Sequence, residues 1–179
     1  AYADFAHQNA IPLLDQYPRL IICRTLSKSY GLAGLRVGYA LASPETISLL
    51  DKAREVYNVD RLAQAAALAS LRDRSYFEQT RDSILKERKK FASHLDEWGW
   101  KTCASGANFL FTRPVDSKGM TGREVATDLY DYLTSKNVLI RYFPQHELTS
   151  SYLRISIGNA GDMNILLETI IEWKTQEQL

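Results

Sequence analysis

Two short apolar runs near the start of the chain predict β-strands. Residues 20–23 and 37–42 are almost free of charged side chains, and polar or glycine-containing segments bound both of them. Runs of this length with such borders are typical of strands rather than helices. We therefore expect two core strands joined by a glycine-containing turn over residues 24–36.

Three helices are expected after these strands. Ser43 followed by Pro44 is typical of a helix start, and this helix should run to about residue 54. Asp60 can cap a second, alanine-rich helix that ends near residue 71. Apolar residues at helical spacing then predict one long helix, with a stripe formed by Phe77, Ile84, Phe91 and Trp98 and a stop at Gly99. A short helix is also expected within residues 10–17.

The pattern changes after Gly99 to short strands with two covering helices. Strands are expected at 100–103, 108–113, 138–143 and 152–157. Thr121 and Glu124 have the spacing of a capping box for a helix that runs to about residue 136, and Asp162 can cap the final helix. We place a domain boundary near residue 75, with an α/β segment before it and a small α+β domain after it.

Composition and charge narrow the possible partners. The 179 residues are 45% hydrophobic and carry a net charge of +1, which favours a globular protein and gives no basic footprint for nucleic acid or an anionic membrane. No apolar run approaches the length of a membrane span, and the start lacks the features of a signal peptide. Cys23 and Cys103 are expected to be small buried residues, and neither they nor the histidines have metal-ligand spacing. These features favour a protein of the reducing cytoplasm.

The turn between the first two strands carries the candidate chemistry. It holds Lys28, the hydroxyls of Thr25 and Ser27, and Arg36 at the entrance of the second strand. An amine beside fixed hydroxyl and guanidinium donors suits a phosphorylated aldehyde, because the amine can condense with the aldehyde and the donors can hold the phosphate. The alternative for Ser27 is a turn residue that satisfies the backbone, and the alternative for Arg36 is a salt bridge at a strand edge.

The sequence of this turn resembles the pyridoxal-phosphate attachment motif of the fold-type-I aminotransferases. The motif T-L-S-K-S-Y-G-L-A-G occupies residues 25–34, and residues 24–42 are most similar to the histidinol-phosphate aminotransferase branch of that family. The similarity continues in the family's order through Y-N-V at 57–59, L-A-Q-A-A-A at 62–67, A-N-F-L at 107–110 and L-R-I-S-I-G at 153–158. The resemblance implies an α/β protein in which residues 1–75 are the C-terminal part of the large cofactor-binding domain and residues 76–179 are the small C-terminal domain.

The resemblance also implies the cofactor, pyridoxal 5′-phosphate, and the residues that bind it. Lys28 would hold the cofactor covalently and, once released, move a proton at the substrate α-carbon. Thr25, Ser27 and Arg36 would contact the phosphate, and Tyr2 would donate to the 3′ oxygen of the ring. Burial of Lys28 and the nearby cation Arg36 would favour its neutral amine. This interpretation requires Lys28 and Arg36 to border one hollow.

Arg154 is the candidate substrate-binding residue. It alternates with Leu153 and Ile155 in a predicted strand, so its side chain should lie on the face opposite the core. The resemblance implies that it binds the substrate's carboxylate or another anionic group. Taken without the resemblance, Arg154 is an ordinary exposed strand arginine.

The expected activity is transamination between histidinol phosphate and 2-oxoglutarate in histidine biosynthesis. Aromatic amino acid aminotransferases and threonine-phosphate decarboxylase share the same motif residues, so both stay open as alternatives. The chain resembles the C-terminal portion of such an enzyme, which is a homodimer in this family, and it lacks the aspartate that pairs with the cofactor ring nitrogen. We therefore expect little activity from this chain by itself. A non-catalytic folded fragment that binds no cofactor is the alternative of another class.

Overall fold

The computed structural model describes residues 1–176, and the chain divides into two compact units, Ala1–Arg81 and the part from Asp82 onward. The division falls inside α3 (Arg74–Glu97), a single long helix that contributes its first turns to one unit and its remainder to the other. The boundary expected near residue 75 lies at the start of this same helix. Each unit is described below by itself.

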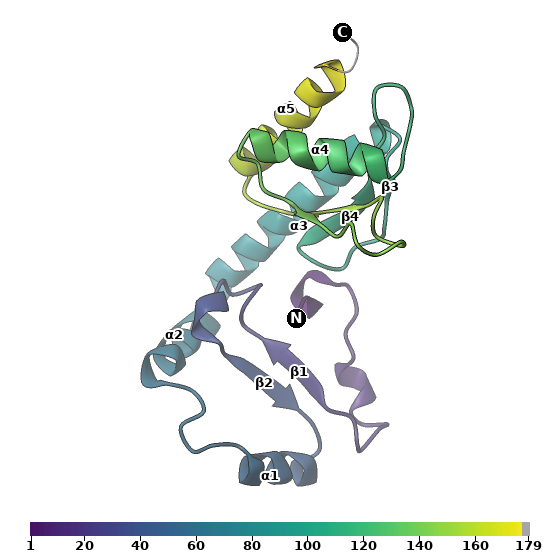
Figure 1. Cartoon of the computed structure of the whole chain (residues 1–179). Helices are drawn as coiled ribbons and strands as arrows, with labels where there is room; N and C mark the ends of the chain where they lie inside the picture. Colours follow the sequence, from purple (N-terminus) through teal and green to yellow (C-terminus); the bar gives the residue numbers. More distant parts are fainter. Residues whose placement is uncertain (177–179) are drawn as a thin grey trace. The chain divides into compact units, whose positions relative to one another are not determined.

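The first unit contains a two-stranded antiparallel sheet (Figure 1). Strand β1 (Ile22–Thr25) pairs with β2 (Gly38–Leu41), and Thr25 lies opposite Gly38 at the end next to the turn. Short 3₁₀ turns lie at Ala3–Phe5, Ile11–Leu13 and Ala33–Leu35. The helix expected within residues 10–17 is thus only one 3₁₀ turn, with Pro12 in its first turn.

The two strands of this unit are not core strands, contrary to the sequence prediction. Cys23 is exposed, and so is Tyr39, with 46% of its surface accessible. Each strand has one neighbour, and a two-stranded sheet has too few covering elements to bury both of its faces. Cys103 is also exposed, directly after the edge strand β3, so the expectation that both cysteines are buried was wrong.

Two helices of this unit begin at the residues that the sequence indicates. The Ser43 hydroxyl accepts a hydrogen bond from Thr46 N at the start of α1 (Pro44–Ala53). The Asp60 carboxylate accepts from Leu62 N and Ala63 N, both at 2.9 Å, at the start of α2 (Arg61–Arg72). Side-chain acceptors at these positions satisfy backbone N–H groups that have no partner within the helix.

The second unit contains a four-stranded antiparallel sheet in the order β3-β4-β6-β5. Its helices, α4, α5 and the C-terminal part of α3, contribute to one hydrophobic core that includes Phe91, Leu129, Leu153, Ile155 and Ile170 (Figure 1). The bounds are β3 (Lys101–Thr102), β4 (Phe109–Arg113), α4 (Arg123–Ser135), β5 (Arg141–Tyr142), β6 (Leu153–Ser156) and α5 (Ala160–Gln176). The mixed helix-and-sheet fold expected from the sequence is confirmed.

Two predicted caps of this unit were wrong in detail. Helix α4 starts after Gly122, whose φ of 133° favours glycine, and the Thr121 hydroxyl does not cap it. At the start of α5, Asn159 Oδ1 accepts from Asp162 N, and Asp162 Oδ2 accepts in turn from Asn159 N. Asn159 is therefore the cap and Asp162 is its reciprocal partner within the first turn, as in a capping box.

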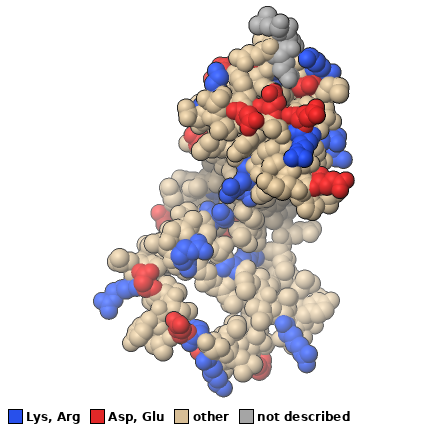
Figure 2. Space-filling view, in the orientation of Figure 1, with Lys and Arg blue, Asp and Glu red and all other residues tan. Residues whose placement is uncertain are grey.

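Charges of both signs are interspersed on the face shown in Figure 2, which agrees with the net charge of +1. Within residues 1–176, no helix is long and apolar enough to cross a membrane. The same part of the chain contains no group of three or more histidine, cysteine, aspartate or glutamate residues placed to hold a metal ion.

Candidate functional site

The turn after β1 is closed at its base by three hydrogen bonds. The carbonyl oxygen of Val37 accepts from Leu26 N at 3.1 Å and from the Thr25 hydroxyl at 3.2 Å, and Leu32 N donates to Leu26 O at 3.2 Å. Gly38 allows this closeness, because a Cβ atom there would lie 2.7 Å from the carbonyl oxygen of Arg24. The backbone that carries Thr25 therefore lies beside the backbone that follows Arg36.

The two hydroxyls of the turn are paired. Thr25 Oγ1 lies 2.8 Å from Ser27 Oγ and accepts a hydrogen bond from Ser27 N at 3.1 Å. This is the local geometry in which a hydroxyl stabilises its own turn. The single Thr25 hydroxyl hydrogen can be donated either to Val37 O or to Ser27 Oγ. When it is donated to Ser27 Oγ, the Ser27 hydroxyl still has its own hydrogen to donate to an anion. The structural role and the binding role of Ser27 are thus compatible.

Lys28 lies near the tip of the turn, where its carbonyl oxygen accepts from Gly31 N at 3.2 Å. Gly31 has a φ of 68°, which favours glycine. Beside Lys28 is a hollow of about 470 Å³, lined by residues 28–31 of the turn and by Ala69, Ser70, Asp73, Tyr76, Phe77 and Thr80 of the helical segments. The Lys28 side chain is exposed, contrary to the expected burial.

Arg36 lies at the base of the turn rather than at its tip. Its backbone is left-handed, with a φ of 55°, and its Nη1 donates to the carbonyl oxygen of Ala33 at 2.8 Å. Arg36 is exposed and is not among the residues that line the hollow beside Lys28. The structure thus places Arg36 close in the fold to Thr25 and Ser27, whereas Lys28 borders a hollow that Arg36 does not line. The expected hollow shared by Lys28 and Arg36 is therefore not found in this unit of the chain as described.

Asp4 contacts the lysine turn, and it was not identified from the sequence. Its carboxylate forms an ion pair with Arg24 Nη1 at 3.3 Å and accepts a hydrogen bond from the Ser29 hydroxyl at 2.5 Å. Ser29 is buried, with 4% exposure, next to Lys28. Tyr2, the predicted ring-contacting residue, is half-buried just before Asp4. Asp4 therefore fastens the segment that carries Tyr2 to the lysine turn. The short motif around Lys28 contains no signal for a partner so distant in sequence.

Tyr30, on the other side of Ser29, packs against the first turns of α3. Its ring stacks on Phe77 with the centroids 4.4 Å apart. Burial raises the pKa of the Tyr30 phenol above its ordinary value, and the negative charge of Asp4 raises this pKa further. Tyr30 and Asp4 thus give the lysine turn an apolar contact on one side and a charged contact on the other.

Arg154, in the second unit, lies on the sheet face opposite the core, as the alternation with Leu153 and Ile155 predicts. Its guanidinium carbon lies 5.2 Å from the ring centroid of Phe109 and 5.9 Å from that of Phe143. Its Nε is buried and has no hydrogen-bond partner among the described residues. Arg141 of β5 is paired directly opposite Arg154. Sequence reasoning missed Arg141, because only the strand register shows that the two arginines are neighbours.

Comparison with known proteins agrees with the family resemblance. The family described as aminotransferase class I and II matches residues 1–170. Histidinol-phosphate aminotransferases of Syntrophotalea carbinolica and Geobacter sulfurreducens are 40% and 41% identical to the chain; each match covers 96% of this chain and 47% of the relative. The chain thus spans about half the length of these relatives, and the correspondence to their C-terminal half stays a prediction.

Solved structures give the same result for the fold. The histidinol-phosphate aminotransferase of Sinorhizobium meliloti, solved in complex with pyridoxal-5′-phosphate, has a TM-score of 0.82 and 28% identity over 98% of this chain and 47% of its own. L-threonine-O-3-phosphate decarboxylase of Porphyromonas gingivalis, at 24% identity and a TM-score of 0.72, shares the fold over 96% of this chain and 53% of its own. With the family match across residues 1–170, these likenesses show that the chain belongs to the class I and II aminotransferases.

Proposed function

We propose that this chain provides the cofactor lysine and phosphate ligands of a pyridoxal-phosphate-dependent aminotransferase that acts on histidinol phosphate and 2-oxoglutarate in histidine biosynthesis. The observation that carries this proposal is the closed turn that carries Lys28 near its tip and gathers the Thr25–Ser27 hydroxyl pair and Arg36 at its base. The names of the relatives support the same substrate. We further propose a cytoplasmic homodimer, in which the rest of the site comes from the part of the relatives that this chain does not span.

The donors at the base of the turn fit the phosphate of the cofactor. A guanidinium and two hydroxyls are strong donors for a phosphate, and Arg36 directs one of its five N–H groups at Ala33 O. Thr25 and Ser27 would hold the phosphate at the start of the turn, and Tyr2 would donate to the ring oxygen. The bound cofactor would supply the electron sink for the substrate α-carbon.

Lys28 would have two tasks in this scheme. Its Nζ would bind the cofactor covalently, which fixes the reactive carbon at the turn. Once free of the cofactor, the same Nζ would move a proton from the substrate α-carbon to the cofactor C4′ carbon, which transamination requires. An exposed lysine is accessible for condensation, but burial is needed to favour its neutral form. We propose that this burial comes from parts of the complete enzyme outside this chain.

The pair of arginines on the second sheet favours a substrate with a phosphate group. Like charges directly opposite each other on two strands destabilise a sheet. Arg141 and Arg154 would be stabilised by an anion that both contact, and a phosphate with two negative charges suits two guanidinium groups. This argument favours histidinol phosphate over an aromatic amino acid. It suits threonine phosphate equally well, so the decarboxylase reaction is the second candidate.

A turnover assay tests the substrate. In a protein that completes this chain to the full length of its relatives, we expect histidinol phosphate to be transaminated at least about tenfold more efficiently than phenylalanine, because one charged contact of about 1.4 kcal/mol changes efficiency tenfold. Arg141→Gln should remove most of this preference, and Arg123→Gln, at the start of α4, is the matched control. Equal turnover of both amines, or release of carbon dioxide from threonine phosphate without transamination, would contradict the proposal.

A further inference from the structure

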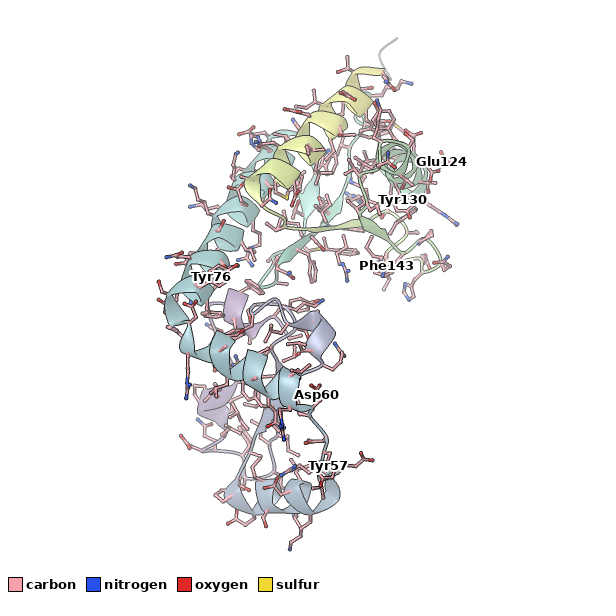
Figure 3. All side chains as sticks on the ribbon, turned by 90° about the vertical axis from the view of Figure 1, so that its left-hand side faces the viewer. Tyr57, Asp60, Tyr76, Glu124, Tyr130 and Phe143 are labelled. Atoms are coloured by element: carbon pink, nitrogen blue, oxygen red, sulfur yellow. The ribbon has the colours of Figure 1, made fainter. Side chains whose placement is uncertain are left out.

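The guanidinium of Arg154 lies between two aromatic rings that come from different segments. Phe109 is the first residue of β4, and Phe143 follows the last residue of β5. Their ring centroids lie 5.2 Å and 5.9 Å from the Arg154 guanidinium carbon. In Figure 3, Phe143 and Tyr130 of α4 lie on opposite sides of the sheet. We call Phe109, Arg154 and Phe143 the aromatic clamp.

The two rings contact the guanidinium without using its hydrogen-bond donors. A cation over an aromatic face is attracted by the ring's electrons, whereas the N–H groups of a guanidinium lie in its own plane. The Nε of Arg154 is buried without a hydrogen-bond partner among residues 1–176. A buried donor of this kind has a free-energy cost that a ligand can offset. The clamp therefore limits the motion of Arg154 and leaves a donor for an anion.

We propose that Phe109 and Phe143 are positioning residues that hold Arg154 ready for the anionic group of the substrate. This inference rests on the proposed function, because it names the residues that prepare the substrate arginine. An arginine loses side-chain entropy when a ligand immobilises it, and a side chain already held in place by packing loses less. The clamp thus increases affinity for the substrate anion, while Lys28 carries out the chemistry independently of it.

Neighbouring aromatic residues provide a matched control. Phe111 lies opposite Arg154 in the strand register, and its ring stacks on Tyr152 with the centroids 4.8 Å apart. A Phe111→Leu variant removes a phenylalanine ring from the same face of the sheet, but it leaves both rings of the aromatic clamp in place. A change at Phe143 should disturb the fold less than a change at Phe109, because Phe143 is exposed and Phe109 is half-buried.

The first test compares KM with kcat in the completed enzyme. We expect Phe143→Leu and Phe109→Leu each to raise the KM for histidinol phosphate at least about threefold, since loss of a cation–π contact at a partly exposed site corresponds to a change of that size. The kcat at saturation should stay within about twofold, since the proton transfer at Lys28 is unchanged. Phe143→Tyr, which keeps a ring, should restore the wild-type KM. An unchanged KM in Phe143→Leu, or an equal rise in Phe111→Leu, would overturn the proposal.

The second test needs no catalysis and separates the two proposals. Inorganic phosphate is titrated into this chain while the Arg154 Nε–H signal is followed by NMR, with Phe143→Leu and Phe111→Leu in parallel. We expect saturable binding that weakens at least about threefold in Phe143→Leu alone. Equal phosphate affinity in all three proteins, or no response at Arg154, would contradict the positioning role of the aromatic clamp. If the phosphate titration gives the expected result but the completed enzyme shows no turnover, the proposed function is contradicted and the positioning role of the aromatic clamp is supported.

Discussion

At the residue scale, the surroundings of Lys28 explain how one exposed turn keeps a defined shape. Asp4 bridges Arg24 and Ser29, one on each side of Lys28, and Tyr30 stacks on Phe77. The ion pair is partly buried, so it is less weakened by solvent than a surface pair. These contacts fix the backbone around the amine, while the amine itself remains accessible. Both properties suit the role proposed for Lys28, because a lysine that binds a cofactor must be accessible and must keep a constant position.

The raised pKa of Tyr30 predicts a loss of stability at alkaline pH. Because burial and then Asp4 raise this pKa in the folded state, the phenol should lose its proton at lower pH when the chain unfolds. The stabilisation is complete below the ordinary pKa of 10.0 and falls as the pH rises through the folded-state value. Thermal unfolding followed between pH 8 and 12 should show a steeper decline for the wild type than for Tyr30→Phe.

Two further variants serve as controls for this pH dependence. Tyr57, with 92% of its surface exposed (Figure 3), should keep the wild-type decline when changed to Phe. Asp4→Asn should reduce the decline in part, because it removes the second cause of the raised pKa. If Tyr30→Phe and Tyr57→Phe lose stability along the same curve as the wild type, the buried position of the Tyr30 phenol is wrong.

At the element scale, helix starts could be predicted from sequence where one nearby side chain decides them. Ser43 and Asp60 both cap the helices that follow them, because a cap needs only an acceptor and a backbone N–H a few residues on. Thr121 has equally good spacing, but Gly122 starts α4 instead. The exposure of β1 and β2 could not be predicted, because burial of an apolar strand depends on elements distant in sequence.

The Asp60 cap should contribute measurably to the stability of the first unit. Asp60→Ala removes the acceptor for two backbone N–H groups at 2.9 Å and should lower the free energy of unfolding by about 1 kcal/mol. Urea denaturation measures this change. Asp51→Ala, which breaks an exposed ion pair with Arg54, should cost less, about 0–0.5 kcal/mol. A loss in Asp51→Ala equal to or greater than that in Asp60→Ala would contradict the capping role.

At the scale of the whole molecule, the family could be predicted from the sequence motif, whereas the arrangement of the site residues could not. The match over residues 1–170 agrees with the resemblance seen around Lys28, and the mixed helix-and-sheet fold follows from the same residues. The arrangement around Arg154 could not be predicted from the sequence, because strand pairing brings Phe109, Phe143 and Arg141 close to it. Likewise, nothing in the motif shows that Arg36 is absent from the lining of the hollow beside Lys28.

The central claim is that Lys28 is the amine that binds pyridoxal phosphate, and covalent trapping tests it most directly. The chain, completed to the length of its relatives, is incubated with the cofactor, reduced with borohydride and digested, and the modified peptide is identified by mass spectrometry. We predict a visible absorbance band that reduction removes and a single modified residue, Lys28, with no labelling in Lys28→Ala and normal labelling in Lys52→Ala. Modification spread over several lysines, or undiminished labelling of Lys28→Ala, would contradict the account.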